Sequence, residues 1–205
     1  MQLPFPIICL ITTGEATTAG VVREAASAAV DLVQIREPTL DSGALLRVVR
    51  DAMVEARGTA CRVLVNDRFD VSIAANAAGV HLRANSVPAA RIRSVAPDGF
   101  LIGRSVHSPS EAAAVTREGG CDYLIFGTVF ASVSKPTGHP VAGLEELERV
   151  CQSTPLPVIA VGGISVGNAR EVHAAGAKGI AAIGLFRGPG SIASTVSKLR
   201  HQFDS

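Results

Sequence analysis

The stretch PVIAVGGISVGNAREVHAAGAKGIAAIG (residues 157–184) contains one complete repeat of the architecture that we expect for the whole chain. It begins with a short apolar run, PVIAV (157–161), and ends with another, KGIAAI (178–183). Between them, the apolar residues of NAREVHAAGA (168–177) return every three or four positions, which is typical of an amphipathic helix. The pattern predicts two buried parallel strands joined by a helix.

Short apolar runs of the same kind recur along the rest of the chain. Amphipathic stretches such as LLRVVRDAMVEA (45–56) lie between them, so strands and helices alternate at about 25 residues per unit. Eight such units predict an α/β fold, a single (β/α)8 barrel that occupies residues 1–205 as one domain. The six further runs are PIICLI (6–11), DLVQI (31–35), RVLV (62–65), GVHL (79–82), FLIG (100–103) and DYLIF (122–126).

An open doubly wound sheet is the other arrangement that alternating strands and helices adopt. A nucleotide-binding sheet of that kind shows the glycine fingerprint GxGxxG after its first strand. The first predicted strand runs into ITTGEATT (11–18), which lacks the fingerprint. The barrel is therefore favoured.

The composition argues against several classes of function. The chain is 47% hydrophobic and has a formal net charge of +1, so no overall field gathers nucleic acid or an anionic membrane surface. Aromatic residues make up 4% of the chain and Trp is absent, which argues against stacking on single-stranded nucleic acid. Any anion site must therefore be local.

The first residues, MQLPFPIICLITTG, show no basic region, and their apolar stretch is too short to cross a bilayer. We therefore expect a cytoplasmic protein with neither a nucleic-acid nor a membrane partner. The sequence leaves open whether the chain forms a homo-oligomer. Four widely spaced cysteines are expected to be buried free thiols, namely Cys9, Cys61, Cys121 and Cys151.

In (β/α)8 barrels, function gathers where the strands end and the following loops begin. Gly162 and Gly163 follow the seventh predicted strand, and Ile183 with Gly184 ends the eighth, ahead of the last helix. Bare amides and a helix N-terminus at these two turns favour the binding of a phosphate group. Tight turns without a ligand are the alternative interpretation.

A polar group ends the second predicted strand. Strand alternation turns Gln34 and Arg36 to one face, with Glu37 beside them. An ion pair between Arg36 and Glu37 could close the mouth of the barrel, or Arg36 could hold phosphate oxygens. We favour the functional interpretation.

Asn66 and Asp67 end the third predicted strand. A carboxylate beside an amide suits Mg²⁺ that also contacts substrate phosphates. The alternative is that Asp67 caps the helix that starts near Phe69, and from the residues alone this role is favoured.

The fifth predicted strand is followed by Ser105, His107 and Ser108. Ser108 with Glu111 fits a capping box, and His107 is either a proton shuttle or a structural residue. His81, within the fourth strand, is expected to form hydrogen bonds inside the barrel.

A long irregular stretch, GTVFASVSKPTGHPV (127–141), follows the sixth predicted strand. Loops of this length are usually functional. Its hydroxyl groups at Ser132 and Ser134 and the cation of Lys135 favour contact with a ligand over the barrel mouth.

Together these segments resemble the thiamine phosphate synthase/TenI family, and the resemblance covers most of the chain. The motifs stand in family order. They are QIRE (34–37), VND (65–67), GVHL (79–82), IGRSVHS (102–108), DYLIFGTVF (122–130), SVSKP (132–136) and PVIAVGGISVGNA (157–169).

The resemblance implies a thiamine-pathway barrel that binds thiazole phosphate at Gly163 and the Ile183–Gly184 turn. In the synthase, a pyrimidine pyrophosphate loses pyrophosphate to give a stabilised carbocation, which the thiazole nitrogen attacks. The resemblance implies that Asp67 holds Mg²⁺ and that Arg36 and Lys135 hold the pyrophosphate. The remaining residues that it places in the site are Gln34, Asn66, Ser105, Ser132 and Ser134.

The chain departs from the synthase pattern at two positions. Pro38 stands where the family has a lysine after QxRE, which removes one cation. A second metal aspartate normally follows HLGQ, but here the sequence reads HLRANS, with Asn85 and Ser86 in that region. Arg83 is a candidate to restore positive charge.

Within the same family, a thiazole tautomerase that needs an acid/base group but no pyrophosphate site is the alternative function, as is a protein that binds thiazole phosphate without catalysis. The tautomerase histidine of the family corresponds to Thr128, which leaves His107 as its substitute. Outside the family, a sugar-phosphate isomerase would need Glu37 with His107 as its acid/base pair. We favour the synthase, a transferase that uses Mg²⁺, because Gln34, Asn66 and Asp67 suit a pyrophosphate substrate.

Overall fold

Eight parallel strands close into a barrel in the computed structural model, which describes residues 3–14, 18–132, 138, 140–188 and 190–203. Each strand pairs with its neighbours in the chain, and β1 pairs with β8 through Ile7 and Gly179 to complete the ring. The predicted (β/α)8 barrel is confirmed. The strands are β1 Ile7–Ile11, β2 Leu32–Ile35, β3 Arg62–Asn66, β4 Gly79–Leu82, β5 Leu101–Val106, β6 Tyr123–Phe126, β7 Val158–Val161 and β8 Gly179–Ala182.

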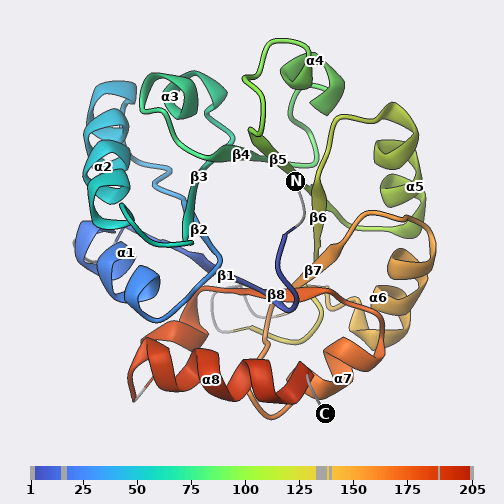
Figure 1. Cartoon of the computed structure of the whole chain (residues 1–205). Coiled ribbons are helices and arrows are strands. Elements are labelled where there is room, and N and C mark those ends of the chain that lie inside the picture. Colours follow the sequence, from blue (N-terminus) through green and yellow to red (C-terminus); the bar gives the residue numbers. More distant parts are fainter. Residues whose placement is uncertain (1–2, 15–17, 133–137, 139, 189, 204–205) are drawn as a thin grey trace.

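Helices surround the barrel in sequence order (Figure 1). They cover the outer faces of the strands, so that each strand is buried on both sides. The helices are α1 Thr18–Ser27, α2 Ser42–Glu55, α3 Phe69–Ala74, α4 Ala89–Arg93, α5 Pro109–Glu118, α6 Gly143–Gln152, α7 Ala169–Ala174 and α8 Ile192–Phe203, with a 3₁₀ turn, η1, at Gly184–Arg187.

The predicted strands agree with the observed ones to within one residue, except at β5. This strand continues to Val106, three residues beyond its predicted end, so Arg104 and Ser105 belong to the sheet rather than to the following loop. The eight predicted units require a helix between the fourth and fifth strands, but the sequence did not locate α4, which at five residues is too short to show a helical period.

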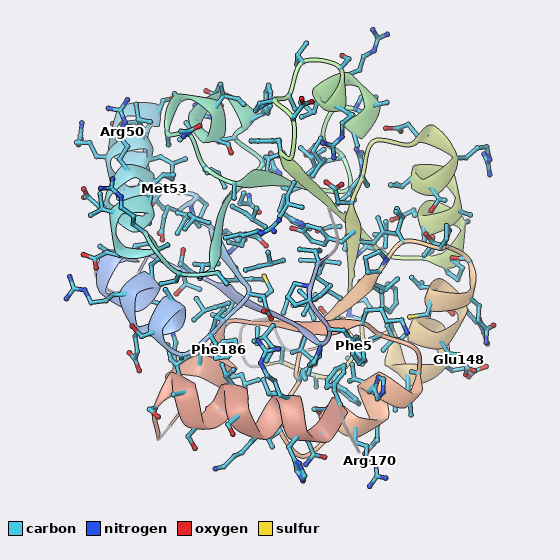
Figure 2. All side chains as sticks on the ribbon, viewed as in Figure 1. Phe5, Arg50, Met53, Glu148, Arg170 and Phe186 are labelled. Carbon is cyan, nitrogen blue, oxygen red and sulfur yellow. The ribbon has the colours of Figure 1, made fainter. Side chains whose placement is uncertain are left out.

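Side chains that point inward fill the centre of the barrel (Figure 2). Because side chains alternate along a strand, every second residue faces this interior. The inward apolar cluster contains Ile7, Cys9, Ile11, Leu32, Leu64, Leu101, Tyr123, Ile125, Ile159 and Ala181. The alternate residues form a second, larger core against the helices, whose charged side chains such as Arg50 and Glu148 lie on the outer side of the ring (Figure 2).

Two of the four cysteines match the expectation of burial. Cys9 and Cys61 are buried, whereas Cys121 and Cys151 are partly exposed, and all four are free thiols. Burial raises the pKa of Cys61 to about 12, so this thiol stays protonated at neutral pH. Within the described ranges, no helix has the length and apolar character needed to span a bilayer.

The interior contains one especially close approach between neighbouring strands. Gly103 on β5 is opposite Tyr123 on β6, and a Cβ atom at Gly103 would lie well under 3.0 Å from the tyrosine ring. Tyr123 is fully buried, so its ring has little room to move. The absence of a side chain at Gly103 therefore makes space for Tyr123.

We predict that Gly103→Ala lowers the free energy of unfolding by about 1–3 kcal/mol, because the added methyl group overpacks a rigid interior. Urea unfolding monitored by circular dichroism measures this change. The matched control is Gly43→Ala in the first turn of α2, where a Cβ meets no atom closer than 3.5 Å. Equal stability of the two variants would contradict the prediction.

Candidate functional site

A layer of polar side chains lies at the carboxyl end of the barrel interior, directly above the apolar cluster. Gln34 on β2 donates from Nε2 to Oδ1 of Asn66 on β3 at 2.8 Å. Nε2 of His81 on β4 lies 2.9 Å from Oγ of Ser105 on β5. The register places Asn66 opposite His81, so four neighbouring strands contribute to one continuous layer. The structure thus brings together three predicted site residues and the predicted interior histidine.

Gln34 leaves one polar atom unpaired in this layer. The residue is only 3% exposed, and its Oε1 has no hydrogen-bond partner among the described residues. A buried acceptor without a partner is costly unless a ligand or a water molecule supplies the missing donor. Gln34 is therefore the side chain in this layer that points most directly to a bound ligand.

His81 is neutral in the folded protein. Its Nδ1 lies 3.2 Å from the hydroxyl oxygen of Tyr123, so both ring nitrogens have partners. Burial lowers the pKa of His81 to about 3, even though the negative charge of Asp67 opposes this shift. The prediction that His81 forms hydrogen bonds inside the barrel is confirmed, and Tyr123 is a member of this network that the sequence did not reveal.

Asp67 does not cap the helix that follows it, so the interpretation favoured from the residues alone is wrong. Arg68 occupies the N-cap position of α3, and no side chain caps this helix. The Asp67 carboxylate instead accepts a hydrogen bond from Oγ of Ser86 and forms an ion pair with Arg83, whose Nε lies 2.7 Å from Oδ2. The backbone of Asp67 adopts φ +61°.

The two partners of Asp67 determine its charge state. Burial acts to raise the pKa of Asp67, but the hydrogen bonds from Ser86 and Arg83 and the charge of Arg83 outweigh this effect and lower it. Asp67 is therefore an ionised carboxylate with its own counter-charge. Both partners come from the β4–α4 loop, which identifies this loop as part of the site.

The donor set around Asp67 does not fit a Mg²⁺ ion in this arrangement. Ser86 contacts Oδ1 and Arg83 contacts Oδ2, so each carboxylate oxygen already has a partner. Within the described ranges, no group of three or more His, Cys, Asp or Glu side chains is placed to hold a metal. Mg²⁺ at Asp67 stays a prediction.

The Arg36–Glu37 ion pair considered for the end of β2 does not form. Glu37 is buried and accepts hydrogen bonds from the hydroxyl groups of Thr12 at 2.7 Å and Thr18 at 3.1 Å, rather than pairing with Arg36. Thr12 also accepts a hydrogen bond from the backbone N–H of Arg36 at 3.0 Å. Arg36 is exposed, which leaves its cation at the rim of the barrel.

The predicted phosphate-binding glycines lie at the ends of β7 and β8. Gly162 and Gly163 have φ values of +101° and +62°, and a Cβ at either position would clash with the segment that follows β6. These contacts alone require glycine there, so phosphate binding by their amides stays a prediction.

Gly184 differs from these two glycines because a Cβ built on it meets no atom of the described residues within 4 Å. Ile183 is the N-cap of η1, so a short 3₁₀ turn follows β8. The helix N-terminus at Gly184 is therefore that of the four-residue η1, and α8 begins only at Ile192.

The fifth strand places a histidine at the rim. Ser108 caps α5 by accepting a hydrogen bond from the Glu111 amide, which confirms its capping role. Glu111 in turn accepts from the backbone N–H of His107, and Nδ1 of His107 lies 3.0 Å from the carbonyl oxygen of Gly127. His107 therefore lies beside the turn that contains Thr128. Glu37 has separate partners near β1, so these contacts give no support to a Glu37–His107 pair.

The structure describes only part of the loop after β6. Ser132 is partly buried, while Ser134 and Lys135 lie outside the described residues. Their predicted contacts with a ligand stay predictions.

Comparisons with known proteins agree with the fold and show the family. The thiamine monophosphate synthase family model matches residues 7–186. A thiamine-phosphate synthase of Methanoculleus marisnigri is 38% identical over 187 residues, which cover 90% of this chain and 87% of that protein. One of Methanocella arvoryzae is 39% identical over 161 residues, covering 78% and 76%. The structure of a thiamine phosphate pyrophosphorylase from Pyrococcus furiosus matches with a TM-score of 0.83 at 31% identity, covering 97% and 96% of the two chains.

The lowered pKa of His81 predicts a specific dependence of stability on pH. The folded chain keeps His81 neutral down to about pH 3, whereas in the unfolded chain an ordinary imidazole binds a proton near pH ~6.5. Between these values the unfolded state holds the extra proton, so stability falls as the pH falls. The free energy of unfolding should decrease by up to about 1.4 kcal/mol per pH unit from this group.

The measurement compares urea unfolding of the wild type and His81→Gln between about pH 6 and pH 4, the window set by the two pKa values. As the pH falls, the free energy of unfolding of the wild type should decrease more steeply than that of His81→Gln, by the amount expected for the uptake of one proton. His201→Gln, which alters an exposed histidine on α8, is the control. Parallel pH curves for the wild type and His81→Gln would show that His81 does titrate normally in the folded state.

Proposed function

Because the chain belongs to the thiamine monophosphate synthase family, we propose that it joins a pyrimidine pyrophosphate to thiazole phosphate and releases pyrophosphate. The bond between the pyrimidine methylene carbon and the pyrophosphate oxygen breaks, and the leaving group takes the electron pair. The thiazole nitrogen then attacks the resulting carbocation with its lone pair. The product is thiamine phosphate, and no protein nucleophile is needed.

The observation that carries this proposal is the polar layer with its unpaired acceptor at Gln34. A flat heterocycle bound above this layer could donate an N–H group, such as the amino group that the pyrimidine of thiamine carries, to Oε1 of Gln34. Asn66 holds the Gln34 amide in place through the 2.8 Å hydrogen bond. Because the acceptor is buried and preorganised, it would orient the ring without further rearrangement.

The neighbouring residues supply the electrostatic part of the reaction. A departing pyrophosphate develops negative charge, which fixed cations stabilise. Arg36 places one cation at the rim beside the polar layer, and the resemblance assigns a second to Lys135. Ser105, oriented by neutral His81, offers a hydroxyl group on the opposite side of the layer.

The turns after β7 and β8 would hold the second substrate. The resemblance places thiazole phosphate at Gly163 and the Ile183–Gly184 turn, and the open space at Gly184 leaves room for a phosphate group close to the backbone. Arg187 in η1 contacts Thr13 after β1, which fixes one wall of this region.

A thiazole tautomerase is the second candidate, and the position of His107 favours it. The hydrogen bond to Gly127 holds the His107 ring beside Thr128, where the tautomerases of the family have their histidine. With Nδ1 engaged, Nε2 is the atom that could exchange a proton with a ligand. The synthase is preferred because a tautomerase has no need of the Gln34–Asn66 pair.

We predict that the purified protein forms thiamine phosphate and pyrophosphate in equal amounts, and that Gln34→Leu lowers kcat/KM by about tenfold or more, equivalent to about 1.4 kcal/mol. The loss follows from the missing acceptor for the pyrimidine ring. Gln152→Leu, which changes an exposed glutamine on α6, should retain full activity. Chromatographic detection of thiamine phosphate measures both.

Failure to form thiamine phosphate, with thiazole phosphate still bound, would reject the synthase. A tautomerisation assay with His107→Gln would then test the second candidate.

A further prediction concerns Gly184. Gly184→Val should weaken the binding of thiazole phosphate by about tenfold or more, because the side chain fills the space next to the backbone amide. The stability of the fold should change little, since the added atoms enter open space. Isothermal titration calorimetry measures the affinity, with Gly188→Ala in the same segment as the control. Unchanged affinity in Gly184→Val would place the phosphate elsewhere.

A further inference from the structure

We propose that the guanidinium group of Arg83, fixed by Asp67, occupies the place of a metal ion and binds the pyrophosphate group of the substrate, so that the reaction needs no divalent cation. This inference rests on the proposed function, because it assigns the cation that receives the leaving group. It concerns the β4–α4 loop, residues 83–88, where this chain lacks the second metal aspartate of the family and has Arg83 as the candidate cation.

The location of Arg83 places its charge beside the polar layer, on the outer side. Arg83 comes two residues after His81, and its partner Asp67 directly follows Asn66. The ion pair therefore joins the carboxyl ends of β3 and β4, next to the Gln34–Asn66 pair. The influence of the Asp67 charge on His81 agrees with this proximity.

The guanidinium group is held on one side and open on the other. Its Nε and Nη2 atoms contact Oδ2 of Asp67, yet 64% of the side chain is exposed. Among the described residues, no other acceptor contacts this guanidinium group. Arginine carries five N–H donors in a planar fork, so Nη1 keeps donors that can bind two phosphate oxygens.

The loop itself is built to hold Arg83 in position. Arg104 on β5 is buried and donates to three backbone carbonyl groups of the loop, those of Ala84 at 2.8 Å, Ser86 at 3.0 Å and Val87 at 2.9 Å. Ser86 accepts from the Arg83 amide at 2.9 Å and donates to Asp67. The backbone of the loop is thus fixed before any ligand arrives.

This arrangement competes directly with a metal ion. A divalent cation at Asp67 would have to displace either Arg83 or Ser86 from the carboxylate, and it would then lie beside the positive charge of Arg83. The metal ion and the Arg83 guanidinium group would both contact the Asp67 carboxylate, and two positive charges that close repel each other strongly in a partly buried site. A fixed guanidinium group supplies positive charge to the leaving pyrophosphate without this cost.

The direct test is calorimetric titration of inorganic pyrophosphate into the purified protein in the presence of EDTA. We expect binding without a metal ion, and a loss of affinity of about 10- to 100-fold in Arg83→Gln, the effect of removing a charged hydrogen-bonding group. Arg91→Gln, at an exposed arginine on α4, should bind like the wild type. Circular dichroism confirms that each variant is folded.

Two results would overturn the inference. One is pyrophosphate binding that requires Mg²⁺, and the other is unchanged affinity in folded Arg83→Gln. The proposed synthase reaction fails differently: thiamine phosphate would not form with or without Mg²⁺, while pyrophosphate binding in EDTA would still depend on Arg83.

A reciprocal variant tests the competition with metal. Arg83→Gly combined with Ser86→Asp removes the cation and adds a second carboxylate beside Asp67. We expect this double variant to bind Mn²⁺, detected by electron paramagnetic resonance, and to need Mg²⁺ for pyrophosphate binding. Equally tight Mn²⁺ binding at Asp67 in the wild type, abolished by Asp67→Asn, would show that Arg83 does not replace the metal.

Discussion

The rest of the structure depends on the closure of eight parallel strands into one ring. Because every strand runs in the same direction, residues that follow eight separate strands meet at one rim, although they are far apart in the sequence. Closure also fixes which residues face inward, because a shift of one residue in the register would turn every inward side chain of a strand toward the helices. Gln34, Asn66, His81 and Ser105 form one layer for this reason, above an inward apolar cluster that includes Leu32 and Leu64.

Neutral and charged side chains occupy different positions at the rim of the barrel. The polar layer contains uncharged side chains that bind one another, and burial keeps His81 neutral. The charged pair of Asp67 and Arg83 lies farther out, where Arg83 remains largely exposed. Charges in such a position avoid most of the desolvation that a buried ion pair would suffer, yet they remain close enough to act on a bound anion. The division agrees with a reaction in which a neutral ring and an anionic leaving group must be held side by side.

The fold could be predicted almost completely from the sequence, because buried strands and amphipathic helices leave strong periodic patterns. The polar layer could also be predicted in part, since Gln34, Asn66 and Ser105 stand at strand ends. The partners of Asp67 could not be predicted from the sequence. Arg83 and Ser86 contact it only through the conformation of the β4–α4 loop, which has no period to detect, and a capping role was as consistent with the local sequence. Tyr123 was missed for a related reason, because an apolar run does not show which hydroxyl group meets a histidine on another strand.

The hydrogen bonds from Arg104 limit how the β4–α4 loop can differ between this protein and its relatives. One guanidinium group spans the carbonyl groups of residues 84, 86 and 87, so the spacing between these carbonyls is matched to the size of a single side chain. Side chains in the loop can change without disturbing this match, because the bonds are made to the backbone. An inserted or deleted residue would break it and move Arg83 away from Asp67. The loop should therefore be permissive in sequence but invariant in length wherever an arginine stands at the position of Arg104.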